Sequence, residues 1–190
     1  MDLETLLSIC LGLGLAAACG FRVFVPLLAV SLAAHTGHLE IGDSFHWLAG
    51  TPALVTLAIA TVLEIGGYYI PWLDNLLDSV AGPAAVVAGV ITTASVVTGL
   101  DPMLKWTLAV IAGGGVAGSI QAVTTGLRGA STLSTAGLGN FLVATLEWVA
   151  ATAFALLALV LPIVAFLLLV AMAFFVARRL LRAPATPAAT

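Results

Sequence analysis

Residues Gly126 to Asn140, GLRGASTLSTAGLGN, place a charge and many small polar residues inside an otherwise apolar chain. The charge is that of Arg128, and the hydroxyls belong to Ser131, Thr132, Ser134 and Thr135. A guanidinium and several hydroxyls inside a bilayer are costly unless they are paired or line a cavity. We therefore expect a polar site here, built on non-helical, glycine-rich backbone that protein covers. The alternative is an ordinary connecting loop at the membrane surface.

The composition around this stretch indicates an all-α integral membrane protein. Of the 190 residues, 62% are hydrophobic and only 8% are charged, and the mean hydropathy is +1.19. A soluble domain has about 25% charged residues, so this chain has too few polar residues to cover a soluble surface. The net charge is −3 and there is no basic run, which argues against a nucleic-acid partner.

Five apolar segments predict about six transmembrane helices. The last one is 37 residues long, which as one helix is about 55 Å, nearly twice the ~30 Å hydrocarbon core. We therefore divide it at Pro162 into two spans, with one long tilted helix as the alternative. The segments are Leu3–Ala34, Thr51–Ile70, Val80–Gly99, Lys105–Thr125 and Phe141–Ala177. Between the second and third of them, Asp74–Ser79 is expected to form a short acidic turn.

The first apolar segment is expected to form one span, with a kink or a break near Arg22. Gly20 and Pro26 flank Arg22, and a proline removes one backbone hydrogen bond from a helix. Arg22 should then lie nearer the outer face of the membrane.

The basic residues indicate on which side of the membrane each end of the chain lies. Arg178, Arg179 and Arg182 end the apolar part of the chain and place the C-terminus in the cytoplasm. An even number of spans also places the N-terminus inside and the polar loop His35–Gly50 outside. With six spans Lys105 would lie outside, against the rule that basic residues lie inside, so five spans remain the alternative. We expect the bacterial inner membrane as the location and disorder in the tail, 183–190.

The six spans divide into two halves, 1–99 and 103–182, within a single transmembrane domain, 1–182. An odd number of spans in each half gives the halves opposite orientations, as in transporters built from inverted repeats with interrupted helices. Gly20-Phe21-Arg22 in the first half corresponds to Gly126-Leu127-Arg128 in the second. The match covers few residues, and the architecture is the main argument for the repeat.

Two carboxylates are expected near Arg128. Glu64 and Glu147 lie within apolar segments that run in opposite directions, and counting residues places both on the cytoplasmic side of the midplane. A buried guanidinium cannot lose its proton and requires an anion or carbonyl groups. We therefore predict that Arg128 pairs with Glu147, with Glu64, or with both.

The polar stretch and its surroundings resemble the domain-of-unknown-function 4126 family of small membrane proteins. The resemblance rests on Gly20-x-Arg22, on Pro71-x-x-Asp74-x-x-x-Asp78 and, above all, on Arg128-x-x-Ser131-Thr132-x-Ser134-Thr135-x-Gly137-Leu138-Gly139-Asn140 with Glu147. It covers nearly the whole chain. Phe141 and Trp148 stand where the family's pattern has a proline and an acidic residue. The resemblance implies a membrane protein and no particular substrate.

Catalytic, metal and cofactor sites are not expected. The loop His35–Gly50 contains three histidines and two carboxylates, but it lacks the spacing of a zinc motif. There is no nucleophile elbow with a Gly-x-Ser-x-Gly sequence and no phosphate-binding loop.

The membrane-depth charges and hydroxyls favour a channel or transporter for a small polar solute or ion. Its expected partners are that solute and the lipid bilayer, and assembly into a homo-oligomer is left open. The alternatives are a structural subunit, which would copurify with a larger complex, and a lipid-handling membrane enzyme. The candidate ligand- or ion-binding residues are Arg22, Glu64, Arg128, Ser131, Thr132, Ser134, Thr135, Asn140 and Glu147.

Overall fold

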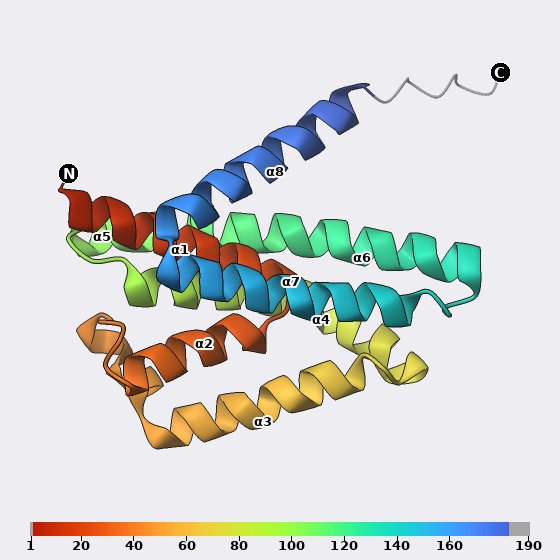
Figure 1. Ribbon diagram of the computed structural model, residues 1–190, viewed down its shortest axis with the longest axis horizontal. Coiled ribbons are helices and arrows are strands. Elements are labelled where there is room, and N and C mark those ends of the chain that lie inside the picture. The colour runs from red at the N-terminus through yellow and green to blue at the C-terminus, as the bar shows by residue number, and fades with distance from the viewer. Residues whose placement is uncertain (1, 183–190) are drawn as a thin grey trace.

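The computed structural model describes residues 2–182, and all the regular structure in this range is helical (Figure 1). The prediction of a disordered tail, 183–190, concerns residues outside this range. The α-helices are α1 (Leu3–Phe21), α2 (Phe24–His35), α3 (Thr51–Gly67), α4 (Pro71–Val96), α5 (Pro102–Leu108), α6 (Gly115–Thr135), α7 (Asn140–Val160) and α8 (Pro162–Arg182). A short 3₁₀-helix, η1 (Asp43–Ala49), precedes α3, and a π-helical segment, η2 (Ala109–Gly114), joins α5 to α6.

The helices have the lengths and composition of an all-α membrane protein. Within residues 2–182, five helices are long and apolar enough to cross a membrane, and η1 with α3, bent by 63°, would make six. The predicted break at Pro162 is confirmed, because α7 ends at Val160 and α8 begins at the proline. Proline is accepted in a first helical turn, where its missing N–H has no helical partner.

Helix α1 forms the centre of the bundle, since α4, α6, α7 and α8 all pack against it. Small residues make this possible: the side chains of Ala16, Ala17 and Ala18 are completely buried. A Cβ on Gly20 would lie 2.5 Å from Cβ of Ile120, so α6 can approach only a glycine here. Such close contact between small residues is how helices associate in a bilayer, where apolar surface alone gives little driving force.

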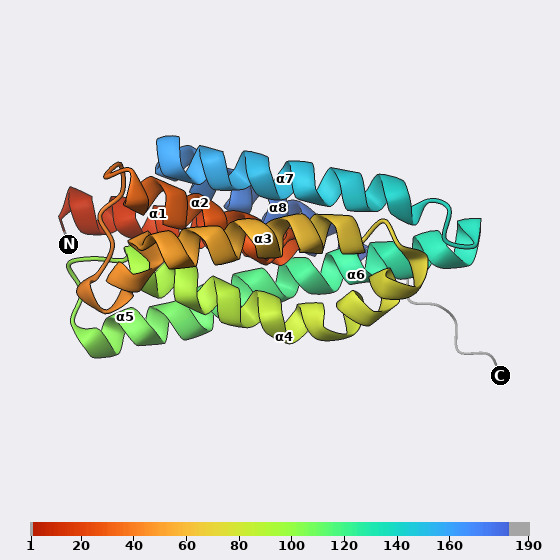
Figure 2. The ribbon, with the colours of Figure 1, turned by 90° about the horizontal axis from the view of Figure 1, so that it is seen from below.

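The Gly114-x-x-x-Gly118 pattern lies against α4. A Cβ on Gly114 would be 3.0 Å from Val90 Cγ2, and one on Gly118 would be 2.9 Å from Val86 Cγ2. The motif therefore supports close packing within the chain. Viewed from below, α4 and α7 lie on opposite sides of the bundle and α3 crosses the front (Figure 2).

The predicted break near Arg22 is confirmed, because α1 ends at Phe21 and α2 begins at Phe24. The chain reverses direction at this break, which corrects the expectation of one span over Leu3–Ala34. Helix α1 runs from one end of the bundle towards the other, and α2 runs back beside it (Figure 1). The expectation that both termini lie on one side assumed a single crossing here. In the structure, α8 runs away from the end at which α1 begins.

Two other boundaries differ from the prediction. Pro102–Thr135 is a continuous helical span of 34 residues, so most of the polar stretch Gly126–Asn140 is helix and only its last residues turn. The expectation of glycine-rich, non-helical backbone there is therefore wrong. The chain turns after Thr135, where Ala136 and Gly137 have φ of 53° and 88°. Helix α4 likewise begins at Pro71, before the acidic residues that had been expected to form a turn.

Candidate functional site

The site begins at the break between α1 and α2. Arg22 is extended, with φ −148° and ψ 133°, and α2 starts at Phe24. Backbone N–H groups at a helix start lack helical partners and favour a negative charge. Glu64 of α3 supplies it: Oε1 accepts from Val23 N at 2.8 Å and Oε2 accepts from Phe24 N at 3.0 Å. Glu64 thus stabilises the start of α2 from a buried position.

The Arg22 side chain points into the protein and is 2% exposed. Its Nη2 lies 2.9 Å from Glu147 Oε2 and donates to the carbonyl of Ala144 at 3.2 Å. Its Cζ lies 3.7 Å from the centre of the Tyr68 ring. The Nε and Nη1 groups have no hydrogen-bond partner within residues 2–182. Arg22 is therefore only partly satisfied by its neighbours.

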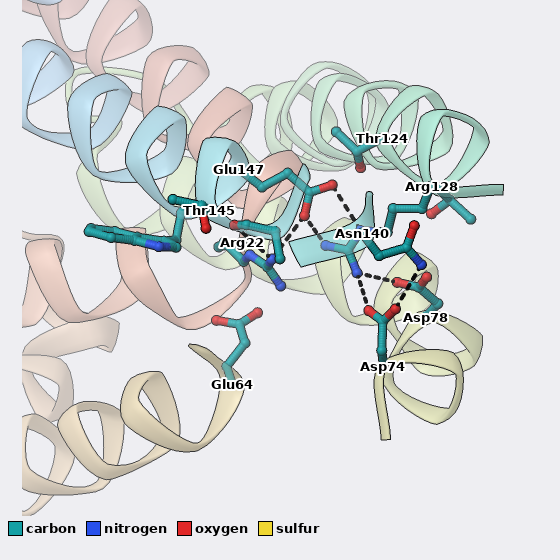
Figure 3. Close-up of polar contacts among 12 residues, drawn as sticks. Arg22, Glu64, Asp74, Asp78, Thr124, Arg128, Asn140, Thr145 and Glu147 are labelled. Atoms are coloured by element: carbon teal, nitrogen blue, oxygen red, sulfur yellow. Dashed lines mark hydrogen bonds and ion pairs between the residues drawn. The ribbon is translucent and has the colours of Figure 1, made fainter. Parts of the chain in front are cut away.

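Arg128 of α6 is the most highly connected side chain of the site (Figure 3). It binds Glu147 through two nitrogens, with Nε donating to Oε1 at 3.0 Å and Nη2 to Oε2. Its Nη1 donates to Asp74 Oδ1 at 2.8 Å and to Asp78 Oδ1 at 3.0 Å. Its Cζ lies 4.0 Å from the centre of the Tyr68 ring. A bidentate contact of this kind fixes the orientation of the guanidinium as well as its charge.

Asn140 extends the network at the start of α7. Its Nδ2 donates to Asp74 Oδ2 at 3.2 Å and to Thr132 Oγ1 at 2.9 Å. The carboxylate of Asp74 needs a donor at this point, which fixes the amide orientation, and Asn140 Oδ1 is buried with no hydrogen-bond partner within residues 2–182. We call the set Arg22, Glu64, Tyr68, Asp74, Asp78, Arg128, Asn140 and Glu147 the ion cluster.

The ion cluster contains more negative than positive groups. Its carboxylates are those of Glu64, Asp74, Asp78 and Glu147, and its cations are Arg22 and Arg128. All except Asp78 are buried, and Asp78 is partly buried. Buried charges of one sign in excess are expensive in a low-dielectric interior. The cluster is therefore suited to take up a proton or another cation.

A cavity of about 320 Å³ borders the ion cluster next to Asp74 and Asn140. Aromatic side chains form part of its wall, and Tyr69 and Phe141 pack edge to face with ring centres 5.0 Å apart. Tyr69 is positioned by its hydroxyl, which lies 3.0 Å from Thr145 Oγ1 and accepts from Trp148 Nε1 at 3.2 Å. The lining residues are Tyr68, Tyr69, Asp74, Thr132, Ala136, Gly137, Leu138, Asn140 and Phe141.

The predicted pairing of Arg128 with Glu147 is confirmed, whereas Glu64 forms no ion pair with Arg128 within the described chain. The prediction that Arg22 lies apart, nearer the outer face, is wrong. The reversal after α1 brings Arg22 to the same glutamate, so one carboxylate serves both arginines.

The predicted hydroxyls separate into two groups. Thr132 contacts Asn140, and Ser131 is partly buried. Ser134 and Thr135 are exposed and donate to backbone carbonyls of their own helix, at Ala130 and Ser131 respectively. Ser134 and Thr135 therefore do not contact the ion cluster. Hydroxyls in helices commonly satisfy themselves in this way.

Asp74 and Asp78 were missed as partners of Arg128, although the sequence contained a signal for them. They are four residues apart, so they share a face if the segment is helical. In the expected turn, Asp74 and Asp78 would share no helical face, so they were not predicted as partners of Arg128.

Comparison with known families and proteins gives one match. The model of a family described as Domain of unknown function (DUF4126) matches residues 9–182. No curated protein matches the chain. No solved structure matches it either.

Proposed function

Since this chain belongs to the family described as Domain of unknown function (DUF4126), whose description assigns no activity, we propose a function from the ion cluster itself. The protein is a membrane transporter or channel for a small polar solute or ion. The observation that carries the proposal is a buried, acid-rich cluster bordering a cavity at one end of a membrane bundle. No catalytic step is part of the proposal.

The charges of the cluster support transport because they are costly for a purely structural purpose. Buried ion pairs often stabilise a protein no better than apolar residues of similar size. Ionisable groups within membrane-spanning helices commonly mark ion or solute pathways. Because carboxylates outnumber guanidiniums in the cluster, binding a proton or another cation would balance its charge.

The broken first segment supports the same proposal. Transporters frequently form their central site at interrupted helices, whose free backbone groups face the solute or a counter-charge. Here the interruption lies between α1 and α2, and Glu64 satisfies the exposed N–H groups. In the second half α6 continues through Gly126–Arg128, so this interruption is not repeated. The division into repeats 1–99 and 103–182 stays a prediction.

The proposal can be tested with purified protein in liposomes, by measuring the uptake of isotope-labelled solutes and, with an internal pH-sensitive dye, the movement of protons. Gradients of small cations, anions and neutral polar solutes should produce protein-dependent flux for at least one of them. Asp78→Asn removes one charge but leaves Arg128 with Asp74 and Glu147, so the protein should fold. It should reduce flux, because the cluster then holds one carboxylate fewer for the proposed exchange of protons or cations.

Glu40→Gln is the matched control, because Glu40 is exposed in the loop after α2. This variant should transport like the unmodified protein. Flux no greater than in empty liposomes for every solute would contradict the proposal. A constant partner that copurifies with such an inactive protein would instead favour the structural-subunit alternative.

We also propose the bacterial inner membrane as the location, with the C-terminal end of α8 in the cytoplasm. Arg178 and Arg179 at that end support the cytoplasmic assignment. Because α1 begins at the opposite end of the bundle, the N-terminal end of α1 then lies outside.

Cysteine labelling of intact cells tests this orientation. In a background with Cys10→Ala and Cys19→Ala, an impermeant thiol reagent should modify Glu4→Cys and Ser44→Cys but not Ser134→Cys. Glu4 in the first turn of α1, Ser44 in η1 and Ser134 in the last turn of α6 are all exposed. The start of α1 and the end of α6 lie at opposite ends of the bundle (Figure 1). Labelling of Ser134→Cys alone would reverse the assignment.

A further inference from the structure

The cavity beside the ion cluster has its own charge pattern. Among the described residues that line it, Asp74 is the one that carries a charge. The two guanidiniums are directed at carboxylates within the cluster and are not part of the cavity wall. A ligand in this cavity therefore meets a carboxylate first, which favours a cation over an anion.

The hydrogen-bonding groups at the cavity are mainly acceptors with unused capacity. Asp74 Oδ1 accepts a bond from Arg128 and Oδ2 accepts one from Asn140, and each oxygen can accept another. Asn140 has used its amide hydrogens on Asp74 and Thr132 and so offers the cavity no free donor. A ligand that supplies several N–H groups would complement this arrangement.

The aromatic wall also favours a cation. The faces of aromatic rings carry partial negative charge and attract ammonium and guanidinium groups. Tyr68 already lies against both guanidiniums of the cluster, at 3.7 and 4.0 Å from its ring centre. Tyr69 and Phe141 present further ring surface beside Asp74.

We propose that this cavity binds the primary ammonium group of a small amine. Its volume of about 320 Å³ is at the small end of ligand cavities and suits a compact molecule. The ammonium would lie against Asp74 and Asn140, with its carbon atoms against Phe141 and Leu138. The ammonium could belong to a free amine or to the headgroup of an aminolipid, since both present the same chemistry. The proposal names a ligand class for the site proposed above and rests on that function for its biological meaning.

Equilibrium binding to protein in phosphatidylcholine nanodiscs tests the free-amine source. n-Butylammonium should bind at least tenfold more tightly than n-butanol, which lacks the charge, and than tetramethylammonium, which lacks N–H groups. Mg²⁺ serves as a probe for a simple cation site. Mg²⁺ binding that exceeds n-butylammonium binding would overturn the proposal.

The aminolipid source is tested by exchanging lipids. Nanodiscs with phosphatidylethanolamine should raise the unfolding temperature above that in phosphatidylcholine, because the trimethylated headgroup offers no N–H groups. A preference for phosphatidylethanolamine that Phe141→Leu abolishes assigns the site to lipid. Equal behaviour in both lipids, with no n-butylammonium binding, would overturn the proposal.

Variants connect the binding to this cavity. Asp74→Asn should weaken ammonium binding more than tenfold, and Ser134→Ala should leave it unchanged. Asp74 is also bonded to Arg128, so Phe141→Leu provides a second test at a side chain that is 58% exposed. It retains an apolar side chain, should fold, and should weaken binding severalfold. Undiminished binding in Phe141→Leu and in a folded Asp74→Asn protein would exclude this cavity.

Binding and transport can fail separately. Ammonium binding in a protein without measurable flux would support the ligand class and contradict the proposed transport. Flux of a different solute in a protein that binds no ammonium would do the reverse.

Discussion

Arg128 and the hydroxyl pair Ser134 and Thr135 lie within two turns of the same helix, yet their environments are opposite. Arg128 is 4% exposed and binds three carboxylates from two other helices. Ser134 and Thr135 are exposed and bond to their own helix. Polar residues in an apolar chain can thus be satisfied by distant partners or by local backbone. The difference teaches that only the first kind marks a site.

The largest effect on stability should come from removing the buried charge of Arg128. Arg128→Ala removes the guanidinium that binds Asp74 and Asp78, and it leaves Glu147 with Arg22 alone. The substitution should lower the free energy of unfolding by about 3–5 kcal/mol. Unfolding of purified protein in detergent would measure it. Arg178→Ala, the same substitution at an exposed site on α8, is the control and should have little effect.

A double mutant sharpens the same test. In Arg128→Ala with Glu147→Gln, the second change should cost less than it does alone, because the paired charges disappear together. Simple additivity of the two costs would show that Arg128 and Glu147 do not stabilise each other. Recovered stability without recovered flux would favour a functional role for Arg128.

An intermediate effect on stability is expected from substituting Glu64, whose carboxylate accepts from backbone N–H groups at the start of α2. Glu64→Gln keeps one acceptor oxygen but presents an NH₂ group to the second N–H, so either Val23 or Phe24 loses its partner. The loss should be about 1–3 kcal/mol. Hydrogen exchange at these two amides should accelerate, while Glu40→Gln should not change it. Unaltered exchange would mean that Glu64 does not stabilise the start of α2.

The smallest effect should come from the exposed hydroxyls. Ser134→Ala removes a local bond at the helix surface and should change the unfolding free energy by less than about 0.5 kcal/mol. Thr132→Ala, two residues earlier on the same helix, removes an acceptor from Asn140 and should cost about 1 kcal/mol. Both hydroxyls are exposed, so equal costs for the two variants, measured by thermal unfolding, would show that the bond from Asn140 to Thr132 adds no stability beyond that of a local bond.

The sequence alone was sufficient for the membrane class, the approximate number of spans and the pairing of Arg128 with an intramembrane glutamate, although it left Glu147 and Glu64 both open as partners. Composition determines the first, because a chain with so few charges cannot cover itself with polar surface. Length determines the second, as at Pro162, where a single helix would exceed the bilayer. The pair followed from depth: two opposite charges at one level of a bilayer have few other partners.

Only the tertiary structure decided which of the remaining polar residues join the site. Arg22 enters because the chain reverses after α1, and reversal at a glycine and proline cannot be told from a kink by local sequence. Asp74 and Asp78 enter because α4 starts early enough to place both on one helical face. Ser134 and Thr135 are excluded because α6 continues through them and directs them outwards. Hydrophobic pattern indicates which segments lie in the membrane, whereas chain reversals and the rotation and end of each helix depend on packing against neighbouring helices.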